Sequence, residues 1–63
     1  MKVAIIGLGY WGPNLVRNFD SHQNIDVKWV FDLDDHKTQK IKKKYSNINI
    51  ATSLDQILND DEI

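Results

Sequence analysis

The chain has 63 residues, of which 8 are Lys or Arg and 9 are Asp or Glu, so its formal net charge is −1. This near-neutral balance argues against a nucleic-acid-binding domain, which normally carries a basic patch, and no apolar run approaches the roughly 20 residues that cross a bilayer. The absence of Cys excludes a disulfide framework and a thiolate metal site, and it favours a reducing, cytoplasmic setting.

The first predicted element is a strand over residues 2–6, in which four apolar residues follow one another without polar alternation. A short apolar run that ends at a glycine is typical of a strand buried on both faces in a parallel sheet. A helix is predicted over about residues 10–19, with Pro13 in its first turn, where the missing N–H costs little. Its packed face is predicted from apolar residues that recur every four positions, with Val16 beside them: Trp11, Leu15 and Phe19.

A second strand is predicted over residues 26–31, where Trp29 alternates with the valine two positions before it and is expected to pack under a crossover helix. An acidic turn follows, and then a basic helix over about residues 36–45, for which Asp34 or Asp35 is the predicted N-cap. This helix carries five lysines. We interpret them as a solvated outer face rather than a surface that binds nucleic acid.

A short third strand is predicted over residues 48–51. Ser53 and Gln56 fit a capping box, which begins a short amphipathic helix that ends near Asn59. The alternation of strands and helices predicts an α/β fold of the Rossmann type, a doubly wound parallel sheet with right-handed crossovers. This chain would supply the first βαβαβα half of that sheet.

The turn between the first strand and the first helix carries the pattern Gly-x-Gly-x-x-Gly. In a dinucleotide-binding turn, Gly7 permits the tight exit from the strand, Gly9 lets the backbone approach a pyrophosphate, and Gly12 allows close packing of the helix on the strand. The helix N-terminus then presents free N–H groups to the phosphates, with Tyr10 and Trp11 as the predicted backbone donors. A plain strand-to-helix turn is the alternative.

An acidic residue follows the second strand at the spacing that this glycine pattern requires. Asp32 lies twenty residues after Gly12, and a carboxylate there accepts hydrogen bonds from both hydroxyls of the adenosine ribose. Its charge would repel a 2′-phosphate and no Arg follows immediately, so the predicted cofactor is NAD rather than NADP. The alternative is that Asp32 only caps a helix or a turn. Lys37 is the one lysine of the second helix near enough to contact an adenosine edge.

Residues 3–15, Val-Ala-Ile-Ile-Gly-Leu-Gly-Tyr-Trp-Gly-Pro-Asn-Leu, resemble the start of the Gfo/Idh/MocA oxidoreductases, the glucose–fructose oxidoreductase and inositol dehydrogenase family. The aromatic pair inside the glycine pattern and the Gly-Pro-Asn that follows are most similar to members that act on sugars or nucleotide sugars. Residues 30–34 resemble that family's second strand end, and residues 52–63 resemble its third crossover helix. The resemblance covers the whole chain.

This resemblance implies an NAD-dependent oxidoreductase, a dehydrogenase that transfers a hydride between the nicotinamide and an alcohol carbon of a sugar or nucleotide sugar. Residues 1–63 would be the N-terminal part of its dinucleotide-binding Rossmann domain, with the remainder of that domain and the substrate domain absent. A chain of this length buries only about 60% of its unfolded surface, so we expect the fragment alone to be marginally stable and inactive.

In the family, a Glu-Lys-Pro motif supplies a lysine near the nicotinamide, and that motif does not occur in this chain. No catalytic residue is therefore carried over, and no metal ligand is predicted. The expected partners are a sugar-like small molecule and, for the full-length protein, further copies in a homo-oligomer, with neither nucleic acid nor a membrane. The alternative function is a non-catalytic nucleotide-binding or sensing module.

Overall fold

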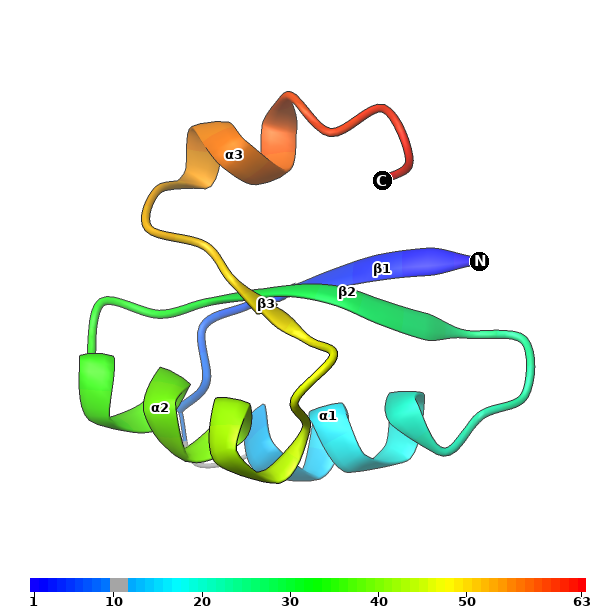
Figure 1. The fold of residues 1–63 in the computed structure, drawn as a ribbon, viewed down its shortest axis with the longest axis horizontal. Helices are drawn as coiled ribbons and strands as arrows, with labels where there is room; N and C mark the ends of the chain where they lie inside the picture. The colour runs from blue at the N-terminus through cyan, green and yellow to red at the C-terminus, as the bar shows by residue number, and fades with distance from the viewer. Residues whose placement is uncertain (10–11) are drawn as a thin grey trace.

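The computed structural model describes residues 1–9 and 12–63. The strands within these residues are parallel and lie in the order β1-β2-β3, so β2 is central. This arrangement confirms the predicted first half of a Rossmann-type sheet. The elements alternate along the chain (Figure 1): β1 (Lys2–Ile6), α1 (Gly12–Asp20), β2 (Asp26–Phe31), α2 (Asp35–Lys44), β3 (Asn49–Ile50) and α3 (Leu54–Leu58).

The helices cover both faces of the sheet, as a doubly wound fold requires. Helices α1 and α2 lie on one face, and α3 lies on the opposite face (Figure 1). The main core lies on the side of α1 and α2, where Val16 and Ile41 pack with apolar residues of β1 and β2. Of the described helices, none is both long and apolar enough to cross a membrane. The residues of the core cluster are Ile5, Leu8, Val16, Val27, Val30, Ile41 and Ile48.

The face of α1 that packs on the sheet differs from the predicted one. Val16 is completely buried, Phe19 is half-buried against the core, and Leu15 is 44% exposed. Each helical residue is rotated by about 100° from the one before it, so residues four apart lie on nearly the same side of the helix. The buried face therefore runs through Gly12 and Val16, one turn apart. The predicted start of the helix and its contact at Trp11 lie outside the described residues.

The two later helices begin close to their predicted positions. Asp34 is the N-cap of α2, because its carboxylate accepts a hydrogen bond from the His36 backbone N–H at 3.0 Å. Ser53 occupies the N-cap position of α3, but its side chain makes no capping hydrogen bond with the described residues. The amide oxygen of Gln56 instead accepts from the Thr52 backbone N–H at 2.6 Å, one residue before the cap. The predicted capping box is therefore wrong for Ser53, whose hydroxyl was expected to cap the helix.

A bulge in the β1–β2 pairing decides which side chains of β2 face α3. The register pairs Val3 with Val27 and then Ala4 with Trp29, so Lys28 is an extra residue on β2. Val27 is buried in the core with Val30, three positions later. Trp29 therefore does not share the face of Val27, contrary to the simple alternation predicted for this strand.

Lys28 and Trp29 together hold the turn that follows α3. The Asp60 carboxylate accepts a hydrogen bond from the Trp29 indole N–H at 2.6 Å and pairs with the Lys28 ammonium at 2.6 Å. Glu62 pairs with Lys28 at 2.5 Å and with Lys2 of β1 at 3.2 Å. The C-terminal turn is thus bound to β1 and β2 through charged side chains that the bulge brings to one face.

Asp60, which bonds to both Lys28 and Trp29, has a lowered pKa. The Lys28 ammonium, followed by the Trp29 N–H, lowers the pKa of the Asp60 carboxyl from 3.8 to about 2. Because the pKa is lower in the folded state, the bonds of Asp60 contribute stability above about pH 4. That contribution is lost as the pH falls from about 4 to about 2.

We predict that Asp60→Asn lowers the thermal midpoint of the intact protein at pH 7, and that the difference from wild type shrinks as the pH approaches 2. The amide cannot pair with the lysine as an anion. The measurement is thermal unfolding followed by circular dichroism at several pH values. Asp61→Asn, at the exposed neighbouring position, is the control. A variant at position 60 whose difference from wild type is the same at pH 7 and pH 2 would contradict this account.

Candidate dinucleotide site at the carboxyl ends of the strands

The carboxyl ends of β1 and β2 place the glycine pattern and Asp32 at the same edge of the sheet. The strands are parallel and in register from Ile5 and Val30 to Ile6 and Phe31. The Gly7 backbone N–H continues this pairing by donating to the Phe31 carbonyl at 2.8 Å. The glycine turn and the acidic turn therefore begin side by side, at the edge where open α/β sheets bind their ligands.

Gly7 has the backbone conformation that the tight exit from β1 needs. Its φ is +85°, in the region that side-chain-bearing residues rarely adopt. It is the one position with positive φ in the described part of the chain. Gly7 therefore makes the tight turn out of β1 that was predicted to require a glycine.

Gly12 and Gly9 differ in what surrounds them. A Cβ on Gly12 would lie 3.0 Å from the Leu8 Cβ and 3.1 Å from its Cδ2, which is tighter than ordinary contact. The close approach at Gly12 is therefore to Leu8 of the turn rather than to the strand. A Cβ on Gly9 would meet none of the described atoms within 4 Å. Packing between these atoms does not require glycine there, and the Gly9 backbone is open to a ligand.

Asp32 directly contacts the glycine turn. The Leu8 backbone N–H donates to its Oδ2 at 2.6 Å, and the Asp34 backbone N–H donates to its Oδ1 at 2.7 Å. The first of these bonds is the main cause that lowers the pKa of the Asp32 carboxyl. The Asp34 N–H and the positive charge of Lys37 act in the same direction. Asp32 is therefore an anion at neutral pH, and it is half-buried beside the turn.

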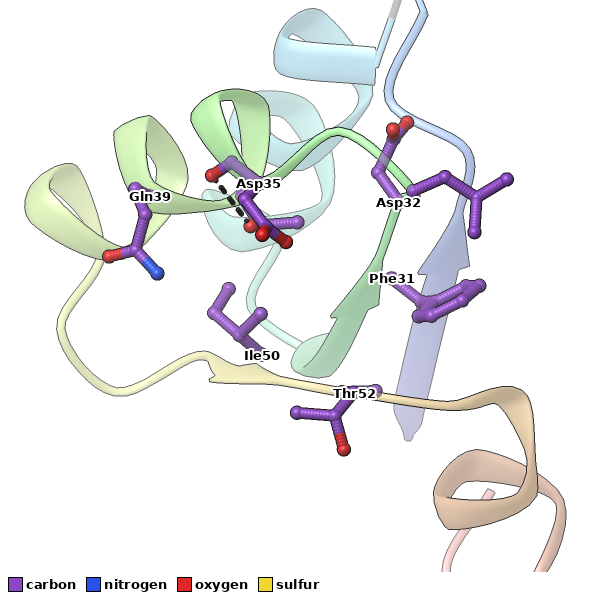
Figure 2. A pocket seen from close by; sticks show the side chains of 9 residues that line it. Phe31, Asp32, Asp35, Gln39, Ile50 and Thr52 are labelled. Carbon is purple, nitrogen blue, oxygen red and sulfur yellow. Dashed lines mark hydrogen bonds between the residues drawn. The ribbon is translucent and has the colours of Figure 1, made fainter.

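Two hollows flank Asp32. The one on the side of β3 has a volume of about 340 Å³, and Figure 2 shows Asp35 and Gln39 approaching it from α2 and Thr52 from beyond β3. The other has a volume of about 290 Å³ and lies at the ends of β1 and β2, where Gly7 lines it. Asp32 lines both, together with Phe31 and Leu33. An extended ligand could therefore cross the carboxylate from one hollow to the other.

The lysines of α2 are exposed, as predicted, except Lys42, which is half-buried and donates to the Ser46 and Ile48 carbonyls at 2.8 and 2.9 Å. Three of the exposed lysines have a more specific place. Lys37, Lys40 and Lys44 line a hollow of about 380 Å³ together with Leu8 and Gly9. Their spacing of three and four residues puts them on one side of the helix. This basic side of α2 therefore faces the glycine turn.

Some residues of the site were not among the predicted ones. Leu8 was an unspecified position of the glycine pattern, yet its N–H holds Asp32. Gln39 lines the hollow on the side of β3 with Asp35, four residues earlier. The signal that could have found it is its place one helical turn after the predicted N-cap position. The two predicted backbone donors, Tyr10 and Trp11, lie outside the described residues. The roles predicted for the glycines and Asp32 toward a ligand stay predictions.

Comparison with known proteins agrees with this geometry. The model of the Gfo/Idh/MocA family, described as an oxidoreductase family with an NAD-binding Rossmann fold, matches residues 1–63. A search of curated proteins and a search of solved structures found no match. The family match spans the whole sequence and includes the glycine turn and Asp32. The chain therefore belongs to the Gfo/Idh/MocA oxidoreductase family and forms part of its NAD-binding Rossmann fold.

Proposed function

We propose that this chain holds NAD for an oxidoreductase, a dehydrogenase that transfers a hydride between the nicotinamide and an alcohol carbon of a sugar or nucleotide sugar. The observation that carries the proposal is the anionic Asp32 carboxylate, 2.6 Å from a backbone N–H of the glycine turn. A ribose and the adjoining pyrophosphate are neighbours in NAD. The two groups that recognise them are neighbours in this fold.

The residues present fit the adenosine diphosphate half of the cofactor. Asp32 would accept hydrogen bonds from the ribose hydroxyls, and the open backbone at Gly9 would face the pyrophosphate. The base would lie in the hollow on the side of β3, near Gln39 and Thr52. The cofactor supplies the hydride chemistry when it is bound, while the protein supplies its position and its electrostatic surroundings.

A preference for NAD over NADP is supported by the charge of Asp32. Its pKa is lowered by backbone N–H donors, so the carboxylate stays ionised and would repel a 2′-phosphate. Lys37 acts in the opposite sense, since it is a positive charge close enough to affect Asp32. The negative charge of Asp32 would outweigh the positive charge of Lys37, because the ribose hydroxyls would contact the carboxylate directly.

The proposed substrate class and assembly rest on the resemblance of residues 3–15 to family members that act on sugars or nucleotide sugars. A sugar-like alcohol is a reasonable hydride donor for this cofactor. A homo-oligomer in the cytoplasm is the corresponding proposal for the full-length protein. Turnover of a panel of sugars and nucleotide sugars, followed by NADH absorbance, tests the reaction class. No activity with any of them would contradict the proposed substrate class.

We predict that Asp32→Ala weakens NAD binding by the intact protein roughly ten- to a hundredfold, the loss expected for hydrogen bonds to a charged acceptor. Discrimination against NADP should fall as well, because the repelling charge is gone. Isothermal titration with both cofactors measures the two effects. Asp26→Ala removes the same charge at the opposite, exposed end of β2 and should leave both affinities unchanged. Wild-type affinities in the Asp32 variant would sink the ribose assignment.

We predict that Gly7→Ala and Gly9→Ala separate the conformational need of the turn from its approach to the ligand. Gly7→Ala should destabilise the intact protein by about 1–3 kcal/mol, because φ is +85° there. Gly9→Ala should change stability by less than about 0.5 kcal/mol but should weaken NAD binding, since its Cβ would stand on the exposed backbone. Denaturant unfolding and cofactor titration measure the pair. Full NAD affinity in the Gly9 variant would refute a pyrophosphate at this turn.

A further inference from the structure

Both oxygens of the Asp32 carboxylate accept hydrogen bonds from backbone N–H groups. Its Oδ2 accepts from the Leu8 N–H at 2.6 Å, and its Oδ1 accepts from the Asp34 N–H at 2.7 Å. Each oxygen thus holds one backbone donor, and the two donors belong to different turns. Leu8 follows β1, and Asp34 precedes α2. A side chain that served only the ribose would not need either bond.

We propose that Asp32 is also a positioning residue, which holds the glycine turn in its ligand-binding shape and so links pyrophosphate binding to the ribose-binding carboxylate. This inference rests on the proposed function and adds a second role to one of its residues. The role is exerted through Leu8. It acts on phosphates that Asp32 itself does not contact.

Packing shows how a bond to Leu8 affects the described residues of the turn and the start of α1. The Leu8 side chain is 1% exposed and belongs to the main core. It also fills the space beside Gly12, where an added Cβ would lie 3.0 Å from the Leu8 Cβ. Asp32 therefore fixes the backbone of a residue whose side chain sets the start of α1. Gly9, the next residue along the turn, is exposed and has no such packing.

The acceptor capacity of a carboxylate allows both roles at the same time. An ionised carboxylate has about four lone-pair sites on its two oxygens. Two of these are used by the backbone donors, so one site remains on each oxygen. Two remaining sites match a ribose with both its 2′ and 3′ hydroxyls free. The ligand class that satisfies the site is therefore a nucleotide with an unmodified ribose diol.

The same count of acceptor sites predicts that asparagine cannot fully replace Asp32. Its amide has one acceptor oxygen and one NH₂ group, which only donates. In either orientation the NH₂ group would face one of the backbone N–H groups, from Leu8 or from Asp34. Asp32→Asn would therefore lose one backbone bond and one ribose acceptor, although its size is unchanged.

The first test follows the Leu8 amide in the ligand-free intact protein by NMR hydrogen exchange. We expect this amide to exchange slowly in wild type, and about tenfold faster or more in Asp32→Ala. Asp34→Ala removes the α2 N-cap and is the matched control for disturbance of the acidic turn. Should Asp32→Ala fail to fold, Asp32→Leu, which is similar in shape and has no acceptor, gives the same readout. A Leu8 amide that exchanges at the wild-type rate in the position 32 variants would overturn the positioning role.

The second test compares ADP with 2′,3′-dideoxy-ADP, which keeps both phosphates and lacks the ribose hydroxyls. If Asp32 holds the turn, Asp32→Ala should weaken dideoxy-ADP binding roughly three- to tenfold, in addition to its larger effect on ADP. If Asp32 contacted only the ribose, dideoxy-ADP would bind the variant as tightly as wild type, or more tightly because a negative charge near the phosphates is gone. Either result would overturn the inference. Asp26→Ala is the control for net charge.

The two tests separate this inference from the proposed function. Failure of the wild-type protein to bind NAD and ADP would overturn the proposed function, and the inference about the cofactor would fall with it. Wild-type NAD binding that weakens in Asp32→Ala, with dideoxy-ADP affinity and Leu8 exchange both unchanged, would leave the proposed function standing. That result would overturn the positioning role alone.

Discussion

The hydrogen bond from the Leu8 backbone N–H to the Asp32 carboxylate joins two turns that lie 24 residues apart in sequence. It forms because β1 and β2 are adjacent parallel strands, so their carboxyl ends lie at the same edge. The bond brings a negative charge against the glycine turn and lowers the pKa of the acid that bears it. The candidate site depends on this contact, because it sets how far the Asp32 carboxylate lies from the backbone of the glycine turn.

The rest of the fold keeps those two turns in place. A core of aliphatic residues fills the space between the sheet and the helices α1 and α2, and buried Leu8 connects it to the glycine turn. On the opposite face, the stabilising contacts between the sheet and the C-terminal turn are polar and charged, from Lys28 and Trp29 to Asp60. This difference is the reason that pH is expected to act on the contacts of the second face. A neutral Asp60 cannot pair with lysine, whereas aliphatic packing does not titrate.

The electrostatics at the ligand edge combine charges of opposite sign. Asp32 is a half-buried anion between two hollows, while three exposed lysines of α2 face the glycine turn beside it. An anion suits a ribose diol, and positive charge nearby favours phosphates. In the proposed function the choice between NAD and NADP depends on one carboxylate, which is why the variants at position 32 are informative.

Local patterns were sufficient to predict the element order, the parallel sheet, the glycine turn and the acid at the end of β2. The glycine turn and the acid depend on residues within one turn, and the parallel sheet follows from the alternation of strands and helices along the chain. The same patterns misplaced Trp29, because the extra residue Lys28 changes the face of the strand only when β1 pairs with β2. They also missed the role of Leu8, whose N–H meets Asp32 only when β1 and β2 pair. Tertiary structure decided these points because register and packing depend on segments that are distant in sequence.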